Sequence, residues 1–275
     1  MDKRLLSIQD ISCVGQCSLT VALPVISACG IETAILPSSV LSNHTGAGFT
    51  GWTFRDLTDD MPKILEQWQK QNITFDAFYT GYVNKTQIPY ILEIMEKTAR
   101  AGALRIVDPV LGDNGKLYPG FDESFPKEIK KLCEGADVIM PNLTEVSYLL
   151  EKPYPGDNYT KDYIEEACRD LHKIGAKNVI ITGVSFEKDK LGCAAFNGST
   201  FDYYFTEKIP QSMHGTGDAF AAAAAGALLR GKSIIESAKI AADFVVESMK
   251  ATLGDKDHWY GVKFEKALPF LIKSL

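Results

Sequence analysis

The feature that most constrains the fold is the succession of a strand, a helix and a second strand near the start of the chain. Residues 4–10 form a short run typical of a strand, and residues 18–29 are apolar enough for a buried helix. Residues 32–37 then form a second strand-like run. This order indicates a βαβ unit, because neighbouring parallel strands need a long crossover between them. The chain is therefore predicted to have an α/β fold with a parallel sheet.

The same alternation continues through the chain without a repeat, a low-complexity linker or a break in composition. It predicts one doubly wound, mostly parallel sheet flanked by helices, in a single domain covering residues 1–275. A short antiparallel strand pair is expected around the hairpin signal Asn197-Gly198-Ser199. The further strands are expected at residues 75–79, 104–107, 136–140, 178–183, 191–196 and 201–208. The further helices are expected at residues 88–101, 122–133, 161–174, 216–229, 233–251 and 262–274, and from a cap at Thr58 or Asp59 through residue 71.

Charge and cysteine content limit the class of protein. A formal net charge of −6 argues against a nucleic acid as a partner. The six cysteines are scattered and form no Cys/His pattern of a zinc site, so reduced thiols in a cytosolic protein are expected. The first residues lack a secretory apolar stretch, and no apolar run approaches the length of a membrane span. The sequence thus predicts a cytoplasmic protein that binds no membrane.

The most informative motif is Met213-His214-Gly215-Thr216-Gly217-Asp218, which leads into an alanine-rich helix. Its two glycines allow a sharp turn, and the amides at the start of the helix favour a bound anion. A carboxylate at Asp218 would repel a phosphate, but it is well placed to take a proton from a hydroxyl that attacks phosphorus. An ordinary helix start, with Asp218 offsetting the helix dipole, explains the motif about equally well.

Other polar residues fall where a parallel sheet places a ligand site. Asp108 follows a predicted strand, and Asn142 and Glu145 begin a helix. Two acids, Asp108 and Glu145, suit a magnesium–nucleotide complex held largely through water, although the local pattern at residues 142–145 favours a purely structural capping box. The loop at residues 42–48 suits either ligand contact or a flexible connection. No Walker-type phosphate loop is present, and no G-x-G-x-x-G follows the first strand, which argues against a dinucleotide-dependent dehydrogenase.

Taken together and in order, these motifs resemble a known superfamily. Gly215-Thr216-Gly217-Asp218, with Asp108-Pro109-Val110 and Asn142-x-x-Glu145 upstream, resembles the ribokinase-like small-molecule kinases. Ser7-Ile8-Gln9, Ser42-Asn43-His44-Thr45 and Gly81-Tyr82 are most similar to the pyridoxal/pyridoxamine kinases within it. The resemblance covers nearly the whole chain. It implies a ribokinase-like fold and ATP-dependent phosphorylation of the 5′-hydroxymethyl group of a B6 vitamer, in the salvage of pyridoxal 5′-phosphate.

The resemblance also implies a role for each matched residue. Asp218 is the implied base, and the amides of Gly215, Thr216 and Gly217 stabilise charge on the transferred group. Asp108 and Glu145 are expected to bind Mg²⁺ with ATP, and Asn142, Thr182, Gly215 and Gly217 to contact the nucleotide. Thr45 and Tyr82 are expected to line the pyridine pocket, with His44 beside them. A homodimer is implied, and whether a monovalent cation such as K⁺ is also needed stays open.

One residue departs from the pattern of the family. Asp10 stands where the vitamin kinases usually have a small hydroxyl residue. Its carboxylate suits the aminomethyl group of pyridoxamine or a protonated ring nitrogen, and predicts a preference for the amine over the aldehyde. A cap on the following turn is an equal alternative for Asp10.

Two alternative functions stay open for the whole chain. A hydroxymethylpyrimidine kinase of thiamine metabolism would share the fold, the glycine turn and the base, whereas a sugar or nucleoside kinase is less similar. A non-catalytic vitamin- or nucleotide-binding protein belongs to a different class. Asp218 argues against that class, because binding alone does not need a base at this place.

Overall fold

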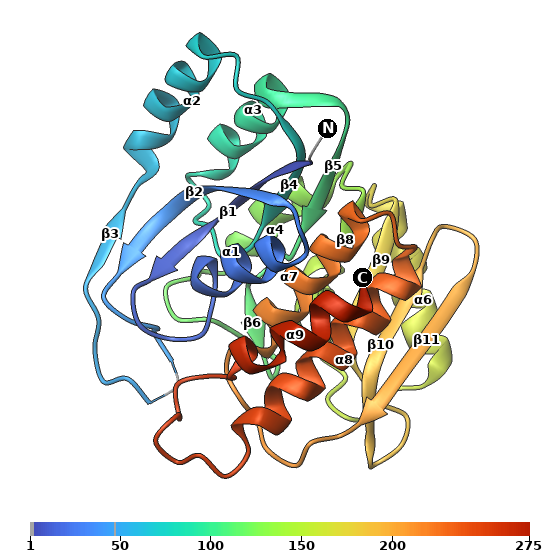
Figure 1. Ribbon diagram of the computed structural model, residues 1–275. Coiled ribbons are helices and arrows are strands. Elements are labelled where there is room, and N and C mark those ends of the chain that lie inside the picture. The colour runs from blue at the N-terminus through green and yellow to red at the C-terminus, as the bar shows by residue number, and fades with distance from the viewer. Residues whose placement is uncertain (1–2, 47) are drawn as a thin grey trace.

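The strands join in one central sheet in a computed structural model that describes residues 3–46 and 48–275. Within this part of the chain the sheet has nine strands in the order β11-β10-β9-β8-β5-β4-β1-β2-β3 (Figure 1). The neighbours from β9 to β2 pair in parallel, while β10 is antiparallel to both β9 and β11, and β3 to β2. The predicted doubly wound, mostly parallel sheet with an antiparallel pair is confirmed. The strands are β1 (Arg4–Ser12), β2 (Glu32–Leu41), β3 (Phe54–Asp56), β4 (Phe75–Thr80), β5 (Ala99–Val107), β8 (Val138–Ile139), β9 (Asn178–Val184), β10 (Lys190–Phe196) and β11 (Phe201–Glu207).

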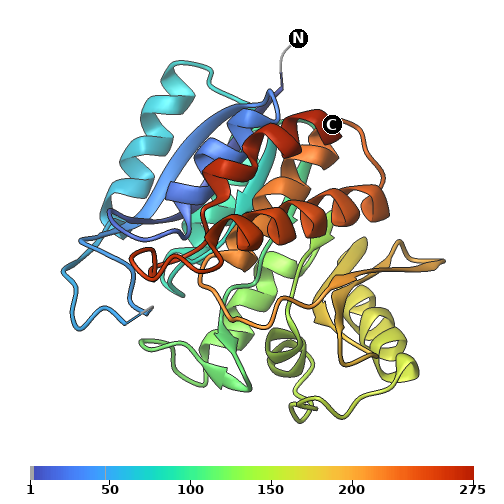
Figure 2. The same cartoon turned by 60° about the horizontal axis from the view of Figure 1, so that its bottom comes forward.

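Helices cover both faces of this sheet (Figures 1 and 2). One buried cluster contains Leu5 of β1 and side chains from a first group of helices on one face of the sheet. The other contains Leu6 of β1 and side chains from a second group on the opposite face. Adjacent residues of a strand point to opposite faces, which is why Leu5 and Leu6 belong to different cores. The first group contains α1 (Leu19–Ala28), α7 (Thr216–Leu229), α8 (Ile234–Thr252) and α9 (Phe264–Ser274). The second contains α2 (Met61–Lys70), α3 (Ile88–Thr98), α4 (Phe125–Cys133), α5 (Leu143–Leu149) and α6 (Lys161–Lys173).

The alanine-rich helix α7 lies in the middle of the first group. Its residues from Ala219 to Leu229 are all buried. A Cβ added at Gly226 would overlap the Sγ atom of Cys29, at the end of α1. The absence of side-chain bulk therefore allows α7 to pack closely between the sheet and its neighbours.

Several boundaries differ from the predicted ones. α3 ends at Thr98 and β5 begins directly at Ala99, so the predicted helix through residue 101 is too long. β2 continues through Pro37 to Leu41, because strand β1 still pairs with it at that point. The helix predicted from a cap at Thr58 or Asp59 starts instead as a 3-10 turn, and α2 begins at Met61. β3 and a hairpin of β6 (Gly112–Asp113) and β7 (Lys116–Leu117) were not predicted.

The parallel register brings the ends of the central strands to the same edge. Ser7 of β1 lies opposite Tyr79 of β4, which in turn lies opposite Ile106 of β5. Asp10 and Asp108 lie beyond this aligned row, toward the carboxyl ends of their strands. This edge of the sheet, at its centre, is therefore the place where the predicted site residues can meet.

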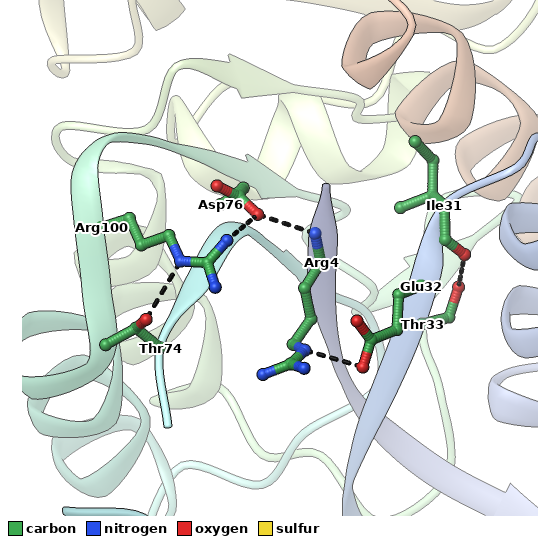
Figure 3. A network of polar contacts seen from close by, with 7 residues as sticks. All are labelled: Arg4, Ile31, Glu32, Thr33, Thr74, Asp76 and Arg100. Carbon is green, nitrogen blue, oxygen red and sulfur yellow. Dashed lines mark hydrogen bonds and ion pairs between the residues drawn. The ribbon is translucent and has the colours of Figure 1, made fainter. Parts of the chain in front are cut away.

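The opposite edge carries a network of charged side chains (Figure 3). Asp76 Oδ2 accepts hydrogen bonds from the Arg4 amide and from Arg100 Nη1, both at 2.7 Å. Arg100 Nε also donates to Thr74 Oγ1 at 3.0 Å, and Arg4 Nε donates to Glu32 Oε1 at 2.8 Å. These contacts connect the amino-terminal ends of β1, β2, β4 and β5.

Two further predictions concern membranes and cysteines. Among the residues that the structure describes, no helix has both the length and the apolar character needed to span a bilayer. All six cysteines are free thiols, and of these only Cys13 is exposed.

Candidate active site

The turn formed by residues 213–217 leads the chain into α7. Gly215 is the N-cap of this helix, with a φ of 77°. A Cβ at this position would overlap the carbonyl oxygen of Gln16, so both the conformation and the close contact require glycine. A Cβ at Gly217, in contrast, would meet no described atom within 4 Å. Because the first amides of a helix have no acceptor within it, the turn presents N–H groups to open space.

Asp218 lies in the first turn of α7 and is half-buried. Its Oδ1 atom accepts a hydrogen bond from the Ser18 amide at 2.9 Å, which fixes the carboxyl against the start of α1. Burial, helped by the negative charge of Asp10 and opposed by the Ser18 amide, raises the pKa of Asp218 to about 6. The carboxyl is thus ionised at neutral pH but more basic than an ordinary aspartate, which suits a general base.

Asp10 lies close to Asp218, on the last part of β1. Its side chain is only 5% exposed, and Ser12 Oγ donates to its Oδ2 atom at 3.0 Å. Burial raises the pKa of Asp10 above its usual value. β1 continues to Ser12, two residues beyond the predicted end of this strand, so Asp10 lies within the strand.

Tyr82 and the turn of residues 42–46 border the same space. The Tyr82 ring stacks on Phe121, with 5.1 Å between ring centroids. Burial raises the pKa of Tyr82, and the charge of Asp10 adds to this shift, so the phenol and this carboxyl are neighbours. In the 42–46 turn, the His44 amide donates to the Val14 carbonyl at 2.9 Å, while Thr45 is exposed.

Asp108 and Glu145 form the other side of the site. Asp108 is 9% exposed, and burial together with the charge of Asp218 raises its pKa well above the usual value. Glu145 is 3% exposed; burial and the charge of Asp108 likewise raise its pKa. The three carboxyls are thus close enough to influence one another in surroundings of low polarity.

The capping box predicted at residues 142–145 is present. Glu145 Oε2 accepts from the Asn142 amide at 2.8 Å, and Asn142 Oδ1 accepts from the Glu145 amide at 3.0 Å. Glu145 Oε1 also accepts from the Leu111 amide at 3.3 Å. Thr182 lies beside Asn142 through a parallel bridge between their backbones. Glu145 therefore has a structural role, and its role toward a nucleotide stays a prediction.

Asp108 and Glu145 suit a cation that takes most of its ligands from water or phosphate. The charged groups that act on Asp108 and Glu145 are the carboxylates Asp218, Asp113 and each other, and such an excess of negative charge favours a bound cation. The described residues contain no group of three or more His, Cys, Asp or Glu side chains placed to hold a metal. Mg²⁺ would therefore need water or phosphate oxygens for most of its ligands, as the sequence predicts.

Some residues near the site were assigned no role from the sequence. Cys17 is buried, and burial with the charges of Asp218 and Asp10 raises the pKa of its thiol. The ring of His214 lies against the ring of His44, beside the start of α7. The β6–β7 hairpin, with its Asn114-Gly115 turn, lies near His214, because the charge of Asp113 in β6 acts on this imidazole. An Asn-Gly pair is a known hairpin signal and was the one available clue to this hairpin.

Comparison with known proteins shows which family the chain is similar to. A family model described as phosphomethylpyrimidine kinase matches residues 60–261. A pyridoxal kinase of Dictyostelium discoideum is 32% identical over 195 residues, which are 68% of this chain and 62% of that protein. The match thus spans less than two thirds of the length of this relative.

Solved structures resemble the chain over almost its entire length. A protein of Bacteroides thetaiotaomicron VPI-5482, provisionally assigned as a phosphomethylpyrimidine kinase and crystallised with pyridoxal, is 38% identical. The likeness covers 98% of this chain and 96% of that one, with a TM-score of 0.93. The pyridoxal kinase of Lactobacillus plantarum is 33% identical, with 98% and 97% of the two chains covered and a TM-score of 0.90.

Proposed function

The chain belongs to the phosphomethylpyrimidine kinase family, and from this premise we propose that it is an ATP-dependent kinase of B6 vitamers. It transfers the γ-phosphoryl group of ATP to the 5′-hydroxymethyl group of pyridoxal, pyridoxamine or pyridoxine. The similarity to pyridoxal kinases in sequence and in structure supports this activity and the ribokinase-like fold. The pyridoxal in the related Bacteroides structure supports the vitamer as acceptor.

The observation that carries the proposal is the position of Asp218 beside the 213–217 turn. In the proposed step, Asp218 takes the proton of the acceptor hydroxyl while the hydroxyl oxygen forms a bond to the γ-phosphorus. The bond from this phosphorus to the β–γ bridging oxygen breaks, and ADP leaves with that electron pair. The amides of Gly215, Thr216 and Gly217 stabilise the charge on the transferred group. A pKa of about 6 for Asp218 supports its role as the base.

Mg²⁺ with ATP is part of the same proposal. The ion, when bound, neutralises charge on the β- and γ-phosphates. Asp108 and Glu145 would hold it, mainly through water, and Asn142 and Thr182 would lie along the nucleotide. The mutual repulsion of the buried carboxyls supports a cation here.

On the acceptor side, we propose that Tyr82, Thr45 and His44 contact the pyridine ring. The stacking of Tyr82 on Phe121 fixes the plane of the phenol ring, which suits a flat aromatic ligand. Asp10 would meet a positively charged nitrogen of the substrate. Its burial supports such a partner, because a buried carboxylate is stabilised by an opposite charge.

A hydroxymethylpyrimidine kinase is the second candidate, and the description of the family model favours it. The two activities need the same base and the same phosphate turn, so only the acceptor separates them. The related structure that contains pyridoxal favours the B6 vitamer.

An assay of ADP release over a panel of acceptors tests the proposal. The panel contains pyridoxal, pyridoxamine, pyridoxine, hydroxymethylpyrimidine and ribose, with the phosphorylated product identified by mass spectrometry. We expect the highest kcat/KM with a B6 vitamer, and a decrease in kcat of ~10²–10⁴ in Asp218→Asn with nucleotide binding retained. A higher kcat/KM for hydroxymethylpyrimidine would assign the second activity. Unchanged turnover in Asp218→Asn would exclude the proposed base.

We further propose that residues 1–275 act as one kinase domain, because nine strands, from β1 near the start of the chain to β11, share one central sheet. The resemblance to the vitamin kinases supports a homodimer. Six free thiols support a reducing compartment, and hence a cytoplasmic location. Size-exclusion chromatography with light scattering measures the oligomeric state directly.

A further inference from the structure

Two histidines from distant parts of the chain meet beside the start of α7. The rings of His44 and His214 have centroids 5.3 Å apart, with an interplanar angle of 59°. His44 belongs to the 42–46 turn, which lies on the acceptor side of the proposed site. His214 directly precedes Gly215, the N-cap of α7. The ring pair therefore joins the acceptor side to the turn that would bind the transferred phosphoryl group.

The hydrogen bonds of His44 define its neutral form. Its Nδ1 atom accepts from the Gly46 amide at 3.1 Å, so this nitrogen is unprotonated and the ring proton is on Nε2. A Cβ at Gly46 would lie 3.1 Å from His44 Cε1 and 3.5 Å from His214 Cε1. Gly46 thus packs against the edges of both rings. Protonation of His44 at Nδ1 would break this hydrogen bond.

The backbone of His214 is held by a hydrogen bond from another part of the chain. Its carbonyl oxygen accepts from the Val262 amide at 3.1 Å. The titratable groups that face its ring are His44 and, from β6, the carboxylate of Asp113. Partial burial of the rings lowers the pKa of both imidazoles, and the charge of His214 lowers the pKa of His44 further. Neutral tilted rings attract each other, whereas two imidazolium ions at this distance repel.

We propose that His214 is a positioning residue that holds His44, and with it the 42–46 turn, against the phosphate-binding turn, and does so only while both imidazoles are neutral. The consequence for acceptor affinity rests on the proposed function. Acid should weaken acceptor binding through loss of this contact, while nucleotide binding, on the other side of the site, should not respond to it.

Steady-state kinetics of three variants test this role. His214→Ala removes the ring, and His214→Phe keeps an aromatic ring that cannot titrate. His172→Phe makes the same substitution in a histidine of α6 that packs on Phe196. At pH 7.5 we expect His214→Ala to raise the acceptor KM about three- to tenfold, the usual worth of an aromatic pair, with nucleotide KM within about twofold. His214→Phe should recover most of this loss, and His172→Phe should leave both KM values as in wild type.

The pH profile separates the contact from general damage to the site. In wild type, the acceptor KM should rise as the pH falls from 7.5 toward 5.5, and in His214→Phe this rise should be smaller. An acceptor KM that does not change in His214→Ala would overturn the proposal. A change confined to nucleotide KM would overturn it as well, and would place His214 on the nucleotide side.

NMR spectroscopy tests the contact without any turnover. The chain has only four histidines, so their Cε1–Hε1 signals can be assigned with single variants. We expect the Gly46 amide signal to follow the titration of His44, and the midpoint of His44 to rise in His214→Phe because a cationic neighbour has been removed. If wild type phosphorylates no B6 vitamer, the proposed function fails, but this titration still decides the contact. A His44 midpoint that is the same in wild type and His214→Phe would overturn the proposed contact.

Discussion

At the residue scale, the site depends on carboxyls that share a poorly solvated space. Asp218 shows the consequence most clearly, since burial raises its pKa from the usual 3.8 to about 6. The hydrogen bond from the Ser18 amide stabilises the ionised form and limits the shift. The residue is thereby kept ionised at neutral pH, yet it remains basic enough to accept a proton from a substrate hydroxyl.

The first prediction concerns the pH dependence of the reaction. Below pH 6 Asp218 is mostly protonated and cannot act as a base, so kcat should fall on the acid side with a midpoint near 6. The residual activity of Asp218→Asn should not show this midpoint. Measuring kcat at saturating acceptor between pH 5 and 8.5 separates this effect from the acceptor KM. A rate that is level down to pH 5 would contradict the assignment.

The second prediction concerns the choice of vitamer by Asp10. Its buried carboxylate favours a cationic group, so kcat/KM for pyridoxamine should exceed that for pyridoxal. In Asp10→Ser this ratio should fall about tenfold, the equivalent of ~1.4 kcal/mol for one charge-assisted hydrogen bond. Competition between the two vitamers in one reaction measures the ratio directly. If kcat/KM is equal for both vitamers and does not change in Asp10→Ser, Asp10 does not select the vitamer. Its contact with Ser12 would then be purely structural.

At the scale of elements, the start of α7 contains two glycines with different structural roles. Gly215 has a positive φ and contacts the Gln16 carbonyl oxygen, whereas Gly217 borders open space. Gly215→Ala should therefore lower the free energy of unfolding by about 1–3 kcal/mol as well as the activity. Gly217→Ala should leave unfolding nearly unchanged and lower kcat, because its methyl group would enter the proposed phosphate space. Denaturant unfolding and turnover of both variants make the comparison, and equal loss of stability would contradict it.

Sequence patterns predicted the long elements well because their burial is regular. The runs at residues 75–79 and 178–183 are strands, since both faces of a central parallel strand are covered and its residues are mostly apolar. Short elements were predicted less well: β3 was not predicted, and β8 is shorter than the strand expected at residues 136–140. β3 forms only through pairing with β2, and β8 is two residues long between stronger neighbours. The boundary at Thr98 depends on pairing of Phe75 with Ala99, a tertiary contact that no local sequence signal contains.

The candidate site was predictable to a similar degree. Asp108 and Asp218 stand out because an acid next to a strand end or a glycine turn is a chemical signal. Glu145 has both a capping and a proposed nucleotide role, so its local pattern could not decide between them. His214 had no such signal, because only the folded chain brings it to His44, far away in sequence.

At the scale of the whole molecule, the two edges of the sheet have separate tasks. The carboxyl-terminal ends of the strands carry acids whose burial is unfavourable for folding but suits the proposed phosphoryl transfer. The amino-terminal edge holds Asp76 between the Arg4 amide and the Arg100 guanidinium (Figure 3). Since the strands lie between these edges, a change at Asp76 should alter stability and leave the site intact.

The last prediction follows from the charge of Asp76. Although partial burial opposes the charge, hydrogen bonds from the Arg4 amide and from Arg100 hold the pKa of Asp76 below its usual 3.8. The carboxylate therefore stabilises the fold above about pH 4, and this contribution is lost as the pH falls through the lower folded pKa. Asp76→Asn should lower the free energy of unfolding by about 1–2 kcal/mol at pH 7, and by less at pH 3.

A matched control lies in the same network. Glu32→Gln removes the more exposed ion pair with Arg4, whose side chains are 30% and 56% exposed, and should cost at most about 0.5 kcal/mol. Urea unfolding at pH 7 and pH 3 compares both variants with wild type, and kcat/KM of both variants at pH 7 should stay within about twofold of wild type. A loss in Asp76→Asn that is as large at pH 3 as at pH 7 would show that packing, rather than charge, is the contribution of Asp76 at this edge.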